Sequence, residues 1–242
     1  MTPRDPTDPT DPMDPMDPAD PVHHRPADRL PRSFFARPVL EVAPDLLGCR
    51  VTHAGVTVRL TEVEAYAGQI DPGSHAYRGP TPRTRVMFGP AGFLYVYFTY
   101  GNHWCANLVV GHEGSASAVL LRGGEVVAGH ELARDRRPGI PLRDWARGPG
   151  RMGQVLALGR DETGRDFCRP PIGEPVDLLV SAPDGGVDRG SIRTGPRVGV
   201  SGPGGDAGVF PWRYWLEGEA TVSAYRPGVV RKRSSDRQGL SR

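Results

Sequence analysis

Short apolar runs, each broken by glycine, proline or arginine, recur along the central part of the chain and predict a structure made mainly of strands. Two pairs of these runs are separated by only two residues, Ala54-Gly55 in the first pair and Gly101-Asn102 in the second. Such spacing is typical of a β-hairpin with a tight turn. The predicted hairpins are Cys49–His53 with Val56–Tyr66, and Phe93–Tyr100 with His103–Val110.

Few segments have the spacing of apolar residues that an amphipathic helix requires. Helices are predicted at Pro44–Leu47, Glu125–Arg137 and Gly150–Leu158. Further short strands are predicted at Ala118–Arg122, Val176–Val180, Arg197–Val200 and Trp212–Leu216. We therefore expect an α+β fold, a single domain with a curved, mostly antiparallel β-sheet and a few helices.

The two ends of the chain differ from this pattern. Residues 1–21 repeat Asp-Pro-x, and each proline lacks a backbone donor and excludes the preceding residue from the helical region. With almost nothing apolar to bury, residues 1–28 are expected to form a disordered tail, either an interaction arm or, as we favour, a dispensable extension. The predicted domain occupies residues 29–226, and residues 227–242 are expected to form a basic C-terminal tail.

The net charge is unevenly distributed along the chain. Six aspartates against one arginine give residues 1–21 a net charge of −5, so the rest of a chain with net charge +2 carries +7. A basic body raises the expectation of a phosphate-bearing partner. No apolar run approaches the roughly 18 residues of a membrane helix, and no secretory signal is present. The three cysteines form no CxxC pair, so we expect a cytoplasmic protein without a disulfide framework or structural zinc.

The strand predicted to end at Tyr66 contains the first candidate chemistry. Glu62, Glu64 and Tyr66 fall on one face, opposite Val63 and Ala65, because side chains alternate along a strand. A two-residue step is about 6.6 Å, so a carboxylate stands beside an aromatic ring. One interpretation is a general base next to a stacking platform. The alternative, which the pattern alone favours, is the solvated side of a half-buried strand.

Aromatic residues are concentrated in the second predicted hairpin. Tyr95 and Tyr97 share a face, and Tyr100 is expected at the tip, where it could wedge into a base stack. The pattern alone favours the alternative, an ordinary β-rich core with a tyrosine at its edge. The stretch Gly148–Gly153 matches GxGxxG, but no strand precedes it and no βαβ unit surrounds it. It predicts instead a helix N-terminus near Pro149.

Several motifs between residues 34 and 216 resemble those of the alkyladenine (3-methyladenine) DNA glycosylase family, in the right order and spacing. The similarity is densest from Glu62 to Asn107, which contains EVEAYAG, DPGSHAYRG and TPRTRVMFGPAGFLYVYFTYGNHWCAN. It extends through FFARPVLEVAPDLLGC, SAVLLR, ARGPGRMGQVLAL, GPRVGVS and PWRY, but not into the Asp-Pro tail.

The resemblance implies a catalytic role for three residues. Glu64, in the family's EAY motif, corresponds to the glutamate that activates the attacking water. Arg122 and the backbone carbonyl of Val198 correspond to the groups that assist it. The chemistry agrees, because displacement of a base by water passes through an oxocarbenium-like sugar, which a nearby carboxylate stabilises.

The resemblance also implies how a flipped base would be held. The base would lie between one aromatic ring and a second pair of rings, beside a residue that crowds the 2-amino group of normal guanine, while a tyrosine fills the gap in the duplex. The corresponding residues are Tyr66 for the first ring, His75 and Tyr97 for the pair, Asn107 for the crowding residue and Tyr100 for the gap. Arg83 and Arg85 are candidates for phosphate contacts, with structural salt bridges as the alternative.

The single lysine constrains the expected mechanism. A bifunctional glycosylase/lyase needs an amine nucleophile, and Lys232 lies in the predicted C-terminal tail. We therefore predict a monofunctional DNA glycosylase without cofactor or metal that starts base-excision repair. Expected substrates are 3-methyladenine and 7-methylguanine in double-stranded DNA, with hypoxanthine and ethenoadenine left open. The protein is expected to act as a monomer in the cytoplasm, associated with the nucleoid.

Two other functions stay open on sequence alone. One is a non-catalytic lesion- or RNA-binding protein on the same fold, and the other is a hydrolase of free nucleosides. The joint presence of Glu64, Arg122 and Val198 favours an enzyme over a binding protein. The basic body and Tyr100 favour a polymeric substrate over a free nucleoside.

Overall fold

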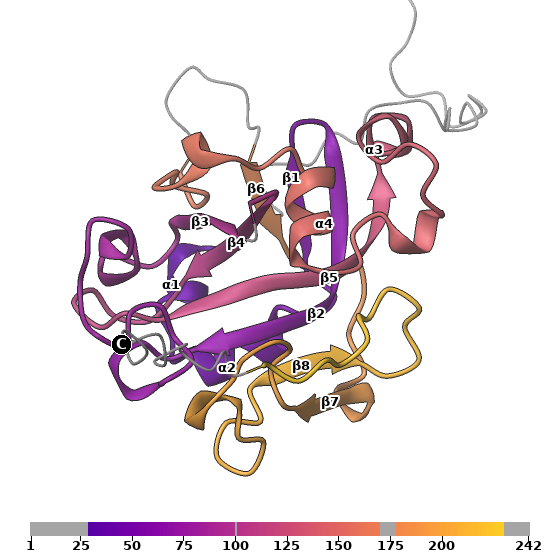
Figure 1. The fold of residues 1–242 in the computed structure, drawn as a ribbon. Helices are drawn as coiled ribbons and strands as arrows, with labels where there is room; N and C mark the ends of the chain where they lie inside the picture. The colour runs from indigo at the N-terminus through magenta and orange to yellow at the C-terminus, as the bar shows by residue number, and fades with distance from the viewer. Residues whose placement is uncertain (1–28, 100, 170–177, 230–242) are drawn as a thin grey trace, which may run out of the picture.

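The computed structural model describes residues 29–99, 101–169 and 178–229, which form one antiparallel β-sheet with short helices around it (Figure 1). The main path through the sheet is β3-β4-β5-β2-β1-β6, with β8 paired to β2 and β7 paired to β8. The strands are β1 (Arg50–His53), β2 (Val56–Tyr66), β3 (Leu94–Thr99), β4 (His103–Val109), β5 (Ala118–Ala128), β6 (Leu178–Ser181), β7 (Ile192–Gly195) and β8 (Arg213–Leu216). The predicted α+β class, with a mostly antiparallel sheet in one domain, is confirmed.

The helices of the described residues are short. The α-helices are α1 (Arg32–Phe35), α2 (Val39–Asp45), α3 (His130–Arg136) and α4 (Pro149–Val155). Single 3₁₀ turns lie at Gly68–Ile70, Arg85–Phe88, Leu142–Asp144, Arg160–Glu162, Arg189–Ser191 and Pro203–Gly205. The helix N-terminus predicted near Pro149 is confirmed, since proline fits the first turn, where an amide has no intrahelical acceptor.

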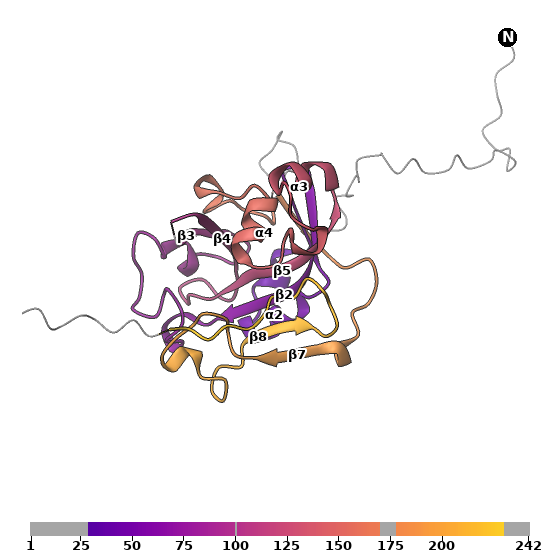
Figure 2. The same cartoon turned by 45° about the vertical axis from the view of Figure 1, so that its right-hand side comes forward.

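The sheet divides along β2. Val56–Arg59 pair with β1 and Glu62–Glu64 pair with β8, while β5 follows the other edge. Two of the three register shifts in the β2–β5 pairing leave Thr61 on β2 and Arg122 on β5 without a residue opposite. Such bulges bend a strand and redirect side chains. Figure 1 shows β2 bending between β1 and β8. Figure 2 shows β7 and β8 side by side, with β8 next to the second half of β2.

The apolar core lies on the face of β2 that carries Val63 and Ala65, both of which are fully buried, as the alternation predicts. Helix α2 contacts β2, β5 and β8, and α4 contacts β4 and β5. Leu121 and Met152 from these elements are fully buried. The opposite face of β2, however, is not solvated: Glu62 and Glu64 are each 0% exposed, so the solvated-face interpretation is wrong.

Both predicted hairpins are confirmed, as is the strand near Trp212–Leu216. The helix predicted at Glu125–Arg137 is wrong in its first part, because β5 continues to Ala128 and α3 begins only at His130. Glu125 lies opposite Arg59 and pairs with it at 2.7 Å, so cross-strand pairing outweighs helix propensity.

Other predicted elements are shifted. The strand predicted at Arg197–Val200 is wrong: β7 ends at Gly195, and Gly199 has a φ of +74°, which a strand does not tolerate. The helix predicted at Pro44–Leu47 corresponds to the end of α2, and α1 was not predicted. The strand predicted at Val176–Val180 is described only from Leu178, where β6 begins, because residues 170–177 lie outside the described part.

The Asp-Pro repeat lies outside the described residues, whereas the chain beyond β8 is described as far as Val229. Gly228 packs closely on Val200, since a Cβ there would lie 2.4 Å from the carbonyl carbon of Val200. Among the described residues, none of the helices has the length and apolar character needed to cross a membrane.

Gly124 provides a test of the close β2–β5 approach. A Cβ at this position would lie 2.4 Å from the backbone oxygen of Arg59 and 2.4 Å from Val58 Cγ1. We expect Gly124→Ala to lower the free energy of unfolding by about 1–3 kcal/mol, the usual cost of overpacking. The matched control is Gly185→Ala, where nothing lies within 4 Å of the added Cβ, and a change within about 0.5 kcal/mol is expected. Urea unfolding measures the free energy of unfolding of both variants. Equal losses for the two would contradict a close β2–β5 approach at Gly124.

Candidate active site

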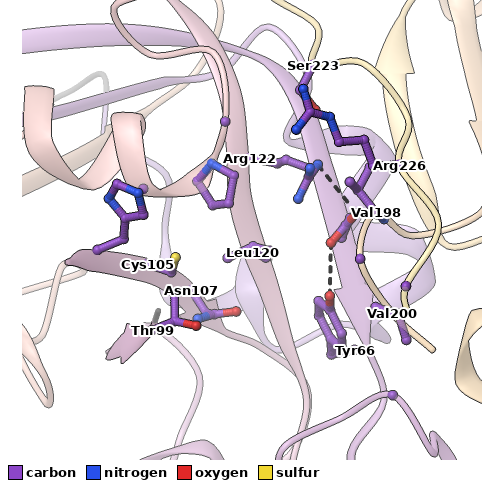
Figure 3. A pocket seen from close by; sticks show the side chains of 18 of the residues that line it. Tyr66, Thr99, Cys105, Asn107, Leu120, Arg122, Val198, Val200, Ser223 and Arg226 are labelled. Atoms are coloured by element: carbon purple, nitrogen blue, oxygen red, sulfur yellow. Dashed lines mark hydrogen bonds and ion pairs between the residues drawn. The ribbon is translucent and has the colours of Figure 1, made fainter. Parts of the chain in front are cut away.

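A pocket of about 1470 Å³ lies over four neighbouring strands and is bordered by connecting segments. From β2, β3, β4 and β5 it is lined by Glu64, Tyr66, Tyr95, Tyr97, Thr99, His103, Cys105, Asn107, Leu120 and Arg122. Further lining comes from segments around His75, Pro149, Val198 and Arg226. Figure 3 shows Tyr66, Arg122 and Val198 gathered on one side, with Cys105 and Asn107 across from them.

The Glu64 carboxylate is held by three groups and shielded from bulk solvent. Its Oε1 accepts a hydrogen bond of 2.7 Å from the Val198 amide and lies 3.5 Å from the Nε of Arg122. Its Oε2 accepts a hydrogen bond of 2.9 Å from the Tyr66 hydroxyl. Since each carboxylate oxygen has two acceptor sites, Oε2 retains one for a further donor at the edge of the pocket. The side chain is 0% exposed although it borders the pocket.

Glu62, two residues earlier, accepts four hydrogen bonds from structural partners. Its Oε1 accepts hydrogen bonds from Arg122 Nε at 2.8 Å, Arg213 Nε at 2.7 Å and Ser223 Oγ at 2.9 Å. Its Oε2 accepts the Ser223 amide at 2.7 Å. Glu62 does not line the pocket, so of the two neighbouring carboxylates only Glu64 can meet a substrate.

Arg122 reaches both carboxylates because it is the bulged residue of β5. Its carbonyl oxygen accepts the Gly148 amide at 3.0 Å, just before α4, instead of pairing with β2. Burial alone would lower the pKa of Arg122, but Glu64 and Glu62 outweigh burial and raise it. The guanidinium therefore remains charged beside the two carboxylates.

Aromatic rings form two walls of the pocket. Tyr66 lies at the end of β2, and burial, followed by the charge of Glu64, raises the pKa of its hydroxyl well above the ordinary value. On the other side, His75 and Tyr97 lie edge to face, with ring centroids 4.6 Å apart. Burial and the charge of Arg83 lower the pKa of His75 to about 4, so this wall is uncharged at neutral pH.

The floor between these walls comes from β4 and β5. Asn107 is 4% exposed, and its Nδ2 donates to the Tyr95 carbonyl at 3.1 Å, which leaves its Oδ1 for the pocket. Cys105 lies opposite Tyr97 across the β3–β4 pair. Burial raises the pKa of Cys105 to about 11, so the thiol is neutral at physiological pH.

A buried ion pair behind Tyr66 was missed at the sequence level. Arg197 and Asp71 are both fully buried and form two hydrogen bonds of 2.6 Å, and Arg197 also donates to the Ala65 and Gly204 carbonyls. The guanidinium carbon lies 4.5 Å from the centroid of the Tyr66 ring. The sequence offered one indication of this pair: Asp71 lies in the motif DPGSHAYRG and Arg197 in GPRVGVS. The strand predicted over Arg197 gave no reason to expect a buried side chain.

The structure brings together seven of the residues predicted for the site: Glu64, Tyr66, His75, Tyr97, Asn107, Arg122 and Val198. Arg83 and Arg85 do not line the pocket, and neither forms an ion pair with another described residue. Arg83 instead donates to the Tyr95 hydroxyl at 3.2 Å. Tyr100 lies outside the described residues.

The rim of the pocket is basic, with arginines from two separate parts of the chain. Arg147, Arg151 and Arg226 line it, with Asp144 beside the first two. The Ser223–Val229 segment, for which the sequence gave no signal, supplies Arg226 and the two hydrogen bonds to Glu62. In the described part of the chain no three His, Cys, Asp or Glu side chains are grouped to hold a metal ion.

The sequence that builds this site also matches a known protein family. The family model described as methylpurine-DNA glycosylase matches residues 33–220. The chain therefore belongs to the methylpurine-DNA glycosylase family.

Similar proteins carry the name "Putative 3-methyladenine DNA glycosylase". One from Streptomyces avermitilis is 54% identical over 213 residues, covering 85% of this chain and 97% of the relative. One from Frankia casuarinae is 53% identical over 202 residues, covering 81% of this chain and 92% of the relative. One from Leifsonia xyli is 51% identical over 205 residues, with the same two coverages of 81% and 92%.

The unequal surroundings of the two glutamates predict unequal effects on stability. Glu62→Gln leaves Arg122 and Arg213 buried without their shared counter-charge, so we expect a loss of about 3–5 kcal/mol in the free energy of unfolding. Glu64→Gln removes a carboxylate whose nearest arginine is 3.5 Å away and still paired to Glu62, so a smaller loss is expected. Urea unfolding of both variants measures these losses. A larger loss of stability for Glu64→Gln than for Glu62→Gln would show that Glu62 is not the main structural carboxylate.

Proposed function

We propose that the protein is a monofunctional DNA glycosylase that removes alkylated or deaminated purines from double-stranded DNA by hydrolysis. The observation that carries the proposal is the Glu64 carboxylate, oriented by Tyr66, Val198 and Arg122 at the edge of an aromatic pocket. Membership of the methylpurine-DNA glycosylase family and the names of the relatives support it. 3-Methyladenine and 7-methylguanine are the proposed substrates, with hypoxanthine and ethenoadenine as further candidates.

Glu64 would act as the general base. A water held at its free acceptor site loses a proton to the carboxylate while its oxygen attacks C1′ of the sugar. The C1′–N bond breaks, and its electron pair leaves with the base. The sugar passes through an oxocarbenium-like state that the carboxylate stabilises. Arg122, charged and 3.5 Å from Glu64 Oε1, fixes the carboxylate in one orientation. In this proposal the Val198 carbonyl also orients the water.

The pocket would hold the extruded base between Tyr66 and the His75–Tyr97 pair. Alkylated purines such as 3-methyladenine carry a positive charge, which aromatic faces attract, and their weakened pairing lowers the cost of flipping. In the proposal, Asn107, which lines the pocket and is nearly buried, crowds the 2-amino group of normal guanine. In the proposal, Tyr100 fills the gap left in the duplex.

The DNA backbone would follow the basic rim formed by Arg147, Arg151 and Arg226. These contacts carry no base sequence information, as is appropriate for an enzyme that searches for damage. We propose that the protein acts as a monomer on chromosomal DNA in the cytoplasm, in association with the nucleoid.

The first test is Glu64→Gln, which keeps the shape of the side chain and removes the base. We expect release of 3-methyladenine from alkylated duplex DNA to fall at least about 100-fold, the lower range for general-base loss. Duplex binding should remain within a few-fold, because the phosphate contacts are unchanged. Full activity of the variant would show that the base is assigned wrongly. Tight binding without base release by the unmodified protein would favour the non-catalytic alternative.

The second test concerns lyase chemistry. In the described residues no lysine lines the pocket, and the only lysine of the sequence is Lys232. We therefore expect an abasic product with an intact phosphodiester backbone, seen as full-length DNA on a denaturing gel until alkali is added. Borohydride should trap no covalent enzyme–DNA adduct, since trapping requires a Schiff base with an amine. A trapped adduct would overturn the monofunctional assignment.

A further inference from the structure

An arginine guanidinium lies against the ring of each of the two tyrosines that form opposite walls of the pocket. The Cζ of Arg197 lies 4.5 Å from the centroid of the Tyr66 ring, and the Cζ of Arg83 lies 5.2 Å from that of Tyr97. Both rings line the pocket, whereas neither arginine is among its described lining residues. Each guanidinium therefore lies against the side of its ring that faces away from the pocket.

The two arginines are fixed in these positions in different ways. Arg197 is 1% exposed and is held by Asp71 and by the carbonyls of Ala65 and Gly204. Arg83 is exposed, and its Nε donates to the hydroxyl of Tyr95 at 3.2 Å. Arg197 therefore cannot bind a substrate phosphate without giving up these contacts.

A cation on one face of an aromatic ring affects what the other face attracts. The ring quadrupole draws cations to its faces, and the interaction strengthens where water is excluded. A guanidinium on the outer face lowers the negative potential that a base meets on the inner face and adds direct charge repulsion. The effect is modest at both positions, because the carboxylate of Asp71 offsets the charge of buried Arg197 and solvent screens the charge of exposed Arg83.

We infer that Arg83 and Arg197 determine specificity by reducing the preference of the pocket for positively charged bases. Stacking then depends on the shape and polarisability of the base as well as on its charge, so that neutral damaged purines are retained. This inference rests on the proposed function, because it concerns the same base pocket. It replaces the phosphate-contact role predicted for Arg83 with a role inside the protein.

The first experiment uses Arg83→Gln in a Glu64→Gln background, where binding can be measured without catalysis. Equilibrium dissociation constants are measured for duplexes containing one 7-methylguanine, which is cationic, or one hypoxanthine, which is neutral. We expect the preference for 7-methylguanine over hypoxanthine to rise about twofold, since the guanidinium is solvent-exposed. The matched control is Arg85→Gln, which removes the same charge two residues later, where the described contacts include no aromatic ring. This variant should weaken binding of both duplexes by the same factor.

The second experiment uses Arg197→Gln with Asp71→Asn, which removes both charges of the buried pair and keeps hydrogen-bonding side chains. Far-ultraviolet circular dichroism confirms folding, and the preference for 7-methylguanine over hypoxanthine should rise about twofold, because the group against the Tyr66 ring loses its positive charge while the pair as a whole loses no net charge. If Arg83→Gln weakens binding of both lesion duplexes by the same factor, Arg83 is a phosphate contact and the inference is overturned. This outcome does not depend on whether the double variant folds. If the unmodified protein releases neither base, the proposed function fails, while the binding ratio still decides this inference.

Discussion

The buried carboxylate of Glu62 is the interaction on which the arrangement of the site depends. Removing a carboxylate from water costs several kcal/mol unless charged partners and hydrogen bonds replace the lost hydration. Here the replacement comes from three separate segments, through Arg122 on β5, Arg213 on β8 and Ser223 beyond β8. Burial of Glu62 therefore fixes the point where the sheet divides and brings the C-terminal segment against the pocket.

This arrangement gives two glutamates on the same face of one strand different chemistry. Glu62 accepts hydrogen bonds from two guanidinium groups and a serine, so it acts as a structural counter-ion. Glu64 meets only a backbone amide, a phenol and a more distant arginine, which orient it and leave acceptor capacity at the pocket. Environment rather than residue type separates the two roles, as is common where paired carboxylates do chemistry. The Arg122 bulge makes this possible, because one guanidinium reaches both carboxylates.

Local signals in the sequence predicted the parts of the fold that local chemistry decides. The two hairpins follow from two-residue turns between apolar runs, and the shared face of Glu62, Glu64 and Tyr66 follows from strand alternation. The failures lie where distant residues decide. Nothing near Arg197 indicates that it bonds to Asp71, 126 residues earlier, and no motif includes Ser223. Likewise, the burial of Glu62 and Glu64 could not be predicted, because the residues that cover this face of β2, such as Val198, Arg213 and Ser223, lie far away in the sequence.

The Arg197–Asp71 pair shows why the site is rigid before any substrate arrives. A buried ion pair is a poor source of stability, and the Nε of Arg197 is left without a hydrogen-bond partner among the described residues. Its other donors, however, join the segment of Asp71, the end of β2 and the turn at Gly204. The residue after Arg197 supplies the amide that holds Glu64. Because moving any of these segments would cost Arg197 a buried hydrogen bond or its counter-charge, the Glu64 carboxylate, its amide donor and the ring of Tyr66 keep one mutual geometry. Catalysis by a fixed polar environment requires such preorganisation, since reorganising the dipoles during the reaction would raise its barrier.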